Sequence, residues 1–147
     1  MKTLLTVTAL IFSLSSFASE RAFISYAGME SWGRSFYACS YAESQTVKHL
    51  KTLGATNIDV TCSGGIDIWM QGPVRMVATF DVPEPTGRDE ARRMTITGNR
   101  RNPSCGLNVA IFKAILPKFS KTISVTSADD SCLSRTSNYS YDLMVDM

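Results

Sequence analysis

Alternating apolar and polar positions divide much of the chain into short strands. The clearest run has an apolar residue at every second position from Val74 to Val82, with mostly polar or charged residues between them. Such period-two alternation predicts a half-buried strand. By the same criterion, strands are expected at residues 22–26, 58–62, 93–97, 123–125 and 139–147. A short extra strand is expected at 66–70, between turns at 63–65 and 71–73.

Two other stretches have apolar residues at three- and four-residue spacing and predict helices at about 40–53 and 105–119. In the first, Cys39 and Leu50 share a side, and Gly54 suits the helix end because it tolerates a left-handed backbone. In the second, Cys105 and Phe112 share a side, and Pro117 interrupts the last turn. Each helix therefore has one apolar side, which includes a cysteine.

The order strand, helix, strand, strand occurs twice, in halves of about 19–82 and 88–147. We therefore predict an α+β fold in which two βαββ-like repeats form a mostly antiparallel sheet, with two helices on one face. The proline-rich segment 83–87 joins the halves. Each half is too small to be stable alone, so we expect residues 19–147 to form a single domain.

The first 18 residues have the features of a secretory signal peptide. Lys2 provides the positive end, an apolar run comes next, and Ser16-Phe17-Ala18 matches the small-x-small cleavage pattern. The run is shorter than the roughly 20 residues that a membrane-spanning helix needs. The sequence therefore predicts a periplasmic or secreted protein, without a membrane span after signal cleavage.

The chain has four cysteines, which an oxidising compartment would convert to disulfides. The preferred pairing is Cys39–Cys62 and Cys105–Cys132, because it joins each helix to a later strand or loop of the same half. The alternative pairing joins the helices through Cys39–Cys105 and leaves Cys62–Cys132. No Cys-x-x-Cys motif is present, so the sequence suggests neither a thioredoxin-like centre nor a zinc knuckle.

Catalytic signatures are lacking in the sequence, and we do not expect an enzyme. His49 is the only histidine, so neither a metal site nor a serine triad is expected, and no cofactor motif occurs. Glu43, on the apolar side of the first helix, is the carboxylate that best suits a hydrolase. A net charge of +2 does not indicate binding to nucleic acid.

Two groups of residues are candidates for binding. Aromatic side chains and arginine in loops suit recognition of a protein or a sugar, and arginine clusters suit anions. The first group comprises Trp32, Arg34, Phe36, Tyr37 and Trp69, of which Trp69 is expected at a hairpin tip. The second comprises Arg88, Arg92, Arg93, Arg100 and Arg101. The alternatives are that Phe36 and Tyr37 pack on the core, and that nearby acids neutralise the arginines.

The sequence therefore favours a non-enzymatic binding module whose partner is an envelope protein or an anionic polymer. A proteinaceous inhibitor of a hydrolase is the alternative. A small carboxylate-dependent hydrolase is less favoured.

Overall fold

A computed structural model describes residues 18–30, 33–34, 36–69, 71–87, 92–98, 104–130, 132 and 139–146. The predicted signal peptide, apart from Ala18, lies outside these residues and stays a prediction, as do the domain boundaries.

Each repeat contains one helix and three main strands. The first repeat consists of β1 (Ala18–Tyr26), α1 (Cys39–Thr52), β4 (Thr56–Ile66) and β5 (Gln71–Val82). The second consists of β6 (Arg92–Gly98), α2 (Cys105–Ile115), the 3₁₀ helix η1 (Leu116–Phe119), β7 (Ile123–Asp129) and β8 (Tyr139–Val145). A two-stranded hairpin, β2 (Met29–Glu30) and β3 (Gly33–Arg34), lies between β1 and α1.

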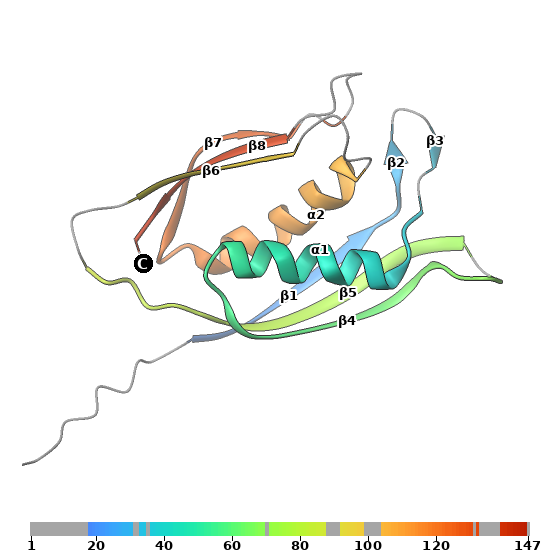
Figure 1. Cartoon of the computed structure of the whole chain (residues 1–147), viewed down its shortest axis with the longest axis horizontal. Coiled ribbons are helices and arrows are strands. Elements are labelled where there is room, and N and C mark those ends of the chain that lie inside the picture. The colour runs from blue at the N-terminus through green and yellow to red at the C-terminus, as the bar shows by residue number, and fades with distance from the viewer. Residues whose placement is uncertain are drawn as a thin grey trace, which may run out of the picture.

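The main strands form two antiparallel three-stranded sheets with the orders β1-β5-β4 and β6-β8-β7. In both, the last strand of the repeat lies in the middle. The α+β fold with two βαββ repeats is therefore confirmed. The structure differs from the sequence prediction in one respect, because each repeat has its own sheet in place of one shared sheet. Both helices lie between the two sheets (Figure 1).

The burial of α2 explains the two sheets. Its buried residues are distributed around the helix and include Leu107, Asn108 and Ile111, so that one sheet alone cannot cover them. Tyr141 of β8 packs on Phe112 of α2 from one side, with 4.9 Å between ring centroids. From the other side, α2 and η1 meet the first sheet, where Phe119 stacks on Phe80 of β5 at 5.6 Å. The two repeats therefore share one hydrophobic core.

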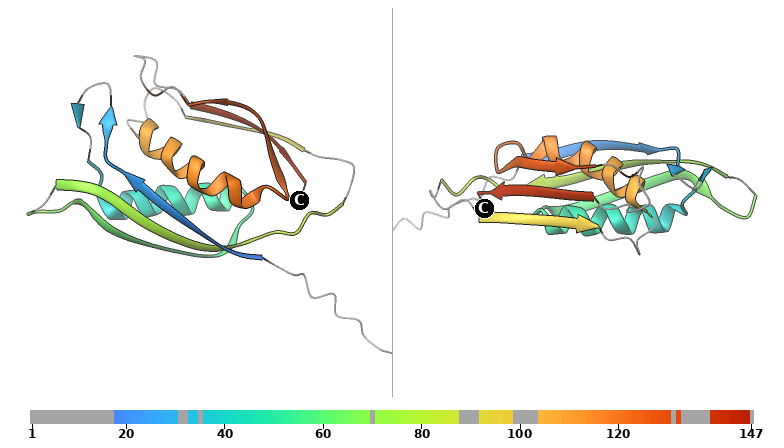
Figure 2. Two further views of the ribbon diagram at one scale, coloured as in Figure 1. Left: turned by 180° about the vertical axis from the view of Figure 1, so that it is seen from behind. Right: turned by 90° about the horizontal axis from the view of Figure 1, so that it is seen from above.

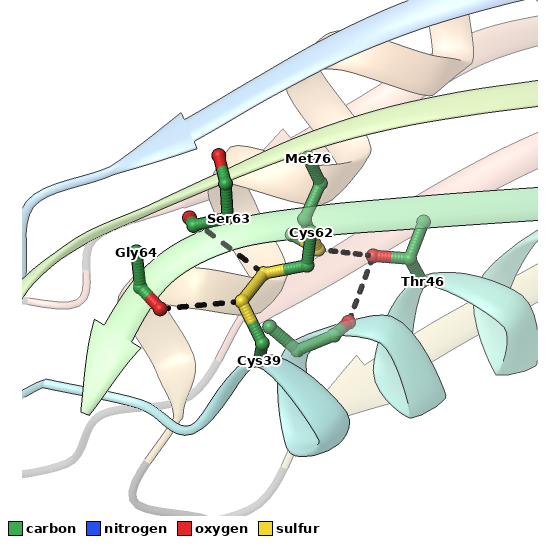
Figure 3. Close-up of a disulfide and its surroundings, with 7 residues drawn as sticks. Cys39, Thr46, Cys62, Ser63, Gly64 and Met76 are labelled. Atoms are coloured by element: carbon green, nitrogen blue, oxygen red, sulfur yellow. Dashed lines mark hydrogen bonds between the residues drawn. A yellow bond between two sulfur atoms is a disulfide. The ribbon is translucent and has the colours of Figure 1, made fainter. Parts of the chain in front are cut away.

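The preferred disulfide pairing is confirmed. Cys39–Cys62 joins the start of α1 to β4, and Cys105–Cys132 joins the start of α2 to the segment after β7. Figure 3 shows the first disulfide, in which Cys39 Sγ lies 3.4 Å from the carbonyl oxygen of Gly64. Because a disulfide sulfur carries no proton, this is a packing contact and not a donated hydrogen bond.

Both expected turns in this region are wrong. Residues 63–65 are part of β4, and residues 71–73 are the start of β5. The expected extra strand at 66–70 is wrong as well, because β4 ends at Ile66 and the described residues 67–69 form the connection to β5. Gly64 and Gly65 both have φ of +80°, and the pairing with β5 shifts between Gly64 and Ile66. Glycine pairs usually mark turns, but here they form a bulge within a continuous strand. A Cβ at Gly64 would collide with the carbonyl oxygen of Pro73 on β5.

Removing the first disulfide tests how much it stabilises the fold. The double substitution Cys39→Ala/Cys62→Ala is expected to lower the free energy of unfolding by about 3 kcal/mol, because it frees a closed loop in the unfolded chain. Urea denaturation followed by circular dichroism measures the change. Cys105→Ala/Cys132→Ala is the matched comparison, because the two disulfides close loops of similar length. The sequence separation is 23 residues for Cys39–Cys62 and 27 for Cys105–Cys132. A loss below about 1 kcal/mol for both pairs would contradict a stabilising role.

Candidate functional site

The turn between β4 and β5 exposes large apolar side chains. Ile68 and Trp69 are each 88% exposed, and Ile66 at the end of β4 is also exposed. We call Ile66, Ile68 and Trp69 the hairpin tip. The backbone N–H of Trp69 donates a hydrogen bond to Oδ1 of Asp67 at 2.6 Å, which shapes the turn. Single exposed apolar residues are common on protein surfaces, but grouped ones indicate a contact surface.

The base of this hairpin is fixed to the start of α1. The Cys39–Cys62 disulfide makes one connection (Figure 3). The backbone N–H of Ile66 donates a hydrogen bond to the carbonyl oxygen of Tyr37 at 3.0 Å. Gly65 allows this approach, because a Cβ there would lie 2.5 Å from the same oxygen. The tip therefore projects from an anchored support, which reduces the entropy lost when a partner binds.

The outer face of the first sheet continues from the hairpin tip. Phe23 on β1, Val77 on β5 and Thr61 on β4 form one cross-strand row. Phe23 is 70% exposed and, together with Val77 and Arg75, lines a hollow of about 640 Å³. Arg75 also lines a second hollow of about 290 Å³ next to the tip. The two hollows share Arg75 and Ser63, and together they extend from Phe23 toward the turn.

The candidates from the sequence do not include Phe23, Arg75 or the two isoleucines of the hairpin tip. The signal for Phe23 was nevertheless present, because the β1 pattern places Ala22 and Ile24 inward and therefore Phe23 outward. An outward aromatic residue on a strand is a candidate contact residue. Arg75 has the same outward parity on β5, but its position beside two hollows depends on the tertiary structure.

The aromatic loop before α1 is only partly described. Trp32 and the side chain of Arg34 lie outside the described residues. Phe36 is partly buried. The Tyr37 ring packs against Tyr26 and Tyr41, with centroid distances of 5.8 Å to each. Tyr37 is therefore partly buried against the hydrophobic core, which agrees with the alternative that this residue packs on the core. The β2–β3 hairpin lies at the same end of the molecule as the hairpin tip (Figures 1 and 2).

The predicted arginine cluster lies partly on β6. Arg92 and Arg93 are exposed there, while Arg88, Arg100 and Arg101 lie outside the described residues. Arg93 pairs with Asp142 at 3.4 Å. The hydroxyl of Thr95 donates to Asp142 at 2.6 Å and, with Arg93, lowers the pKa of that carboxyl. Arg92 and Arg93 thus belong to a different sheet from Trp69, and one of them is ion-paired.

His49 belongs to a hydrogen-bonded chain that joins the two helices. Its Nε2 lies 2.8 Å from Oδ1 of Asn108, which assigns the proton to this nitrogen. Nδ2 of Asn108 donates to Oγ of Ser104 at 3.0 Å, and the Tyr41 hydroxyl lies 2.9 Å from that same Oγ. His49, Asn108 and Ser104 are buried. Because His49 contacts an amide and not the serine, the geometry indicates a structural link between helices.

The candidate carboxylate Glu43 is partly buried on α1. Two other carboxylates, Glu20 and Glu84, line a hollow of about 210 Å³ together with Lys118 and Lys121. Glu20 lies 3.5 Å from Lys118. Glu43, the carboxylate suggested by the sequence, is therefore not among the residues that line this hollow. The two carboxylates that do line it share it with two lysines.

Within the described residues, no three His, Cys, Asp or Glu side chains are grouped so that they could hold a metal ion. No helix in the described part of the chain has the length and apolar character to cross a membrane.

No protein-family model, curated protein or solved structure matches this chain. Its function is therefore inferred from the geometry of the described residues.

The buried imidazole predicts a pH dependence of stability. Burial lowers the pKa of His49 below its ordinary value of 6.5, with nearby Lys48 acting in the same direction and the Asn108 hydrogen bond opposing it. Below about pH 6.5 the unfolded chain binds a proton that the folded chain does not. The free energy of unfolding is therefore expected to fall as the pH decreases from 6.5 toward the folded pKa.

Urea denaturation at a series of pH values measures this dependence. His49→Gln is the control, since its amide N–H can still donate to Asn108 and does not titrate. The chain has one histidine, and carboxylates titrate mostly below about pH 5. The variant should therefore show a nearly constant free energy of unfolding between about pH 5 and 7. An equal decrease in the variant would show that His49 is not responsible.

Proposed function

We propose that this chain is an exported, disulfide-stabilised module that binds a protein partner through the hairpin tip and the outer face of the first sheet. The observation that carries the proposal is the 88% exposure of Ile68 and Trp69 on an anchored hairpin. Burying such side chains stabilises a complex, and the anchored base lowers the entropic cost.

The chemistry of the surface favours a protein over an anionic polymer. Tryptophan and arginine are enriched among residues that dominate binding energy at protein interfaces, and aromatic residues are enriched in interfaces generally. Trp69 is exposed at the hairpin tip, and Phe23 and Arg75 line the larger hollow together with the hydroxyl side chains of Ser25 and Ser63. An anionic polymer would instead use the arginines of β6, where Arg93 is already paired with Asp142.

Two features support export. The predicted signal peptide covers residues 1–18, and all four cysteines are paired in two disulfides. Disulfides of this kind persist in oxidising compartments. The proposed location is therefore the periplasm or the external medium.

Inhibition of a hydrolase is the second candidate, and the projecting hairpin tip is the feature that favours it. An anchored turn with exposed apolar side chains has the form required to enter an enzyme cleft. This narrower function requires a one-to-one complex with an exported hydrolase and loss of that enzyme's activity on binding.

The experiment compares partner binding by the oxidised protein and by Trp69→Ala. Because Trp69 is 88% exposed, its removal should change the free energy of unfolding by less than about 0.5 kcal/mol. Affinity capture from envelope extract, followed by titration of the captured protein, should show binding that survives high salt. Trp69→Ala should weaken it by about 30-fold or more.

Val125→Ala is the matched control, since Val125 is an exposed large hydrophobic residue on the second sheet. It should bind the captured protein like the unmodified chain. Equal binding by Trp69→Ala would contradict the proposal. So would Trp69-dependent sedimentation with phospholipid vesicles in the absence of any captured protein, which would identify a lipid surface as the partner.

A further inference from the structure

A second candidate site lies in the second repeat, in the groove between α2–η1 and the edge strand β7. Its volume is about 350 Å³, and its apolar lining includes Phe112, Leu116, Ile123, Val125 and Ala128. Val125 is 47% exposed, so the groove is open to solvent at the sheet edge. The hairpin tip belongs to the other sheet, and this inference does not depend on the proposed function.

Tyr141 of β8 is also a lining residue of the groove, and its side chain carries a buried, unpaired polar atom. Its side chain is 4% exposed, and its hydroxyl has no hydrogen-bond partner among the described residues. The ring is held in place by Phe112 of α2, at 4.9 Å between centroids, and by cross-strand pairing with Ala128 of β7. Buried hydroxyls in native proteins almost always have partners, so an unpaired one beside a groove indicates a ligand.

The charges around the groove favour an uncharged ligand. Lys113 on α2 and Asp130 after β7 line the rim and form an ion pair at 2.6 Å. These two charges neutralise each other. Burial, with a smaller contribution from Asp130, raises the pKa of Tyr141 to about 12. The phenol is therefore protonated at neutral pH and acts as a hydrogen-bond donor.

We infer that this groove binds a small uncharged molecule whose carbonyl or hydroxyl oxygen accepts a hydrogen bond from the Tyr141 hydroxyl. A volume of about 350 Å³ corresponds to roughly ten non-hydrogen atoms, taking about 30 Å³ for each water-sized group. The ligand class is thus a ketone, ester or alcohol with a compact apolar body, and the site provides one donor and an apolar wall.

Acetophenone and ethylbenzene are suitable probes, because they have similar size and shape and only acetophenone has a carbonyl oxygen. The full chain with labelled methyl groups is titrated with each probe and followed by NMR. Acetophenone should cause saturable shifts at Leu116, Ile123, Val125 and Ala128. Tyr141→Phe, which removes only the hydroxyl, should weaken acetophenone binding about five- to tenfold and ethylbenzene binding less than about twofold.

Two further measurements test the groove, namely the melting temperature of Tyr141→Phe and the probe-induced shifts of Ala128→Phe. Tyr141→Phe should leave the melting temperature unchanged or higher, because the hydroxyl has no partner to lose among the described residues. A clear decrease would show that the hydroxyl has a structural partner and would overturn the inference. Ala128→Phe, at an exposed position of β7, should fill the groove and abolish both sets of shifts.

The inference is also overturned if acetophenone causes no saturable shifts in the groove, or if Tyr141→Phe weakens both probes equally. None of these outcomes bears on partner binding by the hairpin tip, so failure here is distinguishable from failure of the proposed function.

Discussion

The burial of helix α2 is the constraint on which the whole arrangement depends. A helix that is apolar on most of its surface is stable in water only if other elements cover it on several sides. The first sheet, α1 and the second sheet provide that cover. Phe112 of α2 packs on Tyr141 of the second sheet, and Phe119 of the adjoining η1 stacks on Phe80 of the first sheet. The hydrogen-bonded chain from His49 to Ser104 fits this core, because each buried polar group in it has a partner.

The candidate binding surface lies away from this core. The hairpin tip projects beyond the start of α1, and the disulfide and the Ile66–Tyr37 hydrogen bond hold only its base. Side chains at the tip contribute little to folding, since they are exposed, and their apolar character therefore calls for another explanation. Contact with a partner provides one. The second-repeat groove is independent, because it is formed by the separation between α2–η1 and the edge strand β7.

Much of the fold follows from local sequence patterns. Alternation located the strands, and spacing along the helices placed Cys39 and Cys105 toward their sheets, which favoured the observed pairing. Two features depend on contacts that sequence periodicity does not report. Gly64 and Gly65 resemble a turn, but the approach of Pro73 and Tyr37 makes them a bulge. Likewise, the unpaired hydroxyl of Tyr141 becomes evident only when its neighbours among the described residues are known.

Contact between the hairpin tip and a protein partner can be detected by site-specific photo-crosslinking. A photoreactive phenylalanine analogue is placed at position 69 and, as a control, at Ser124 on the exposed face of β7. If the hairpin tip contacts a protein, we expect one discrete protein adduct from position 69 in envelope extract and none from position 124. Adducts of equal yield at both positions, or none at position 69, would contradict it.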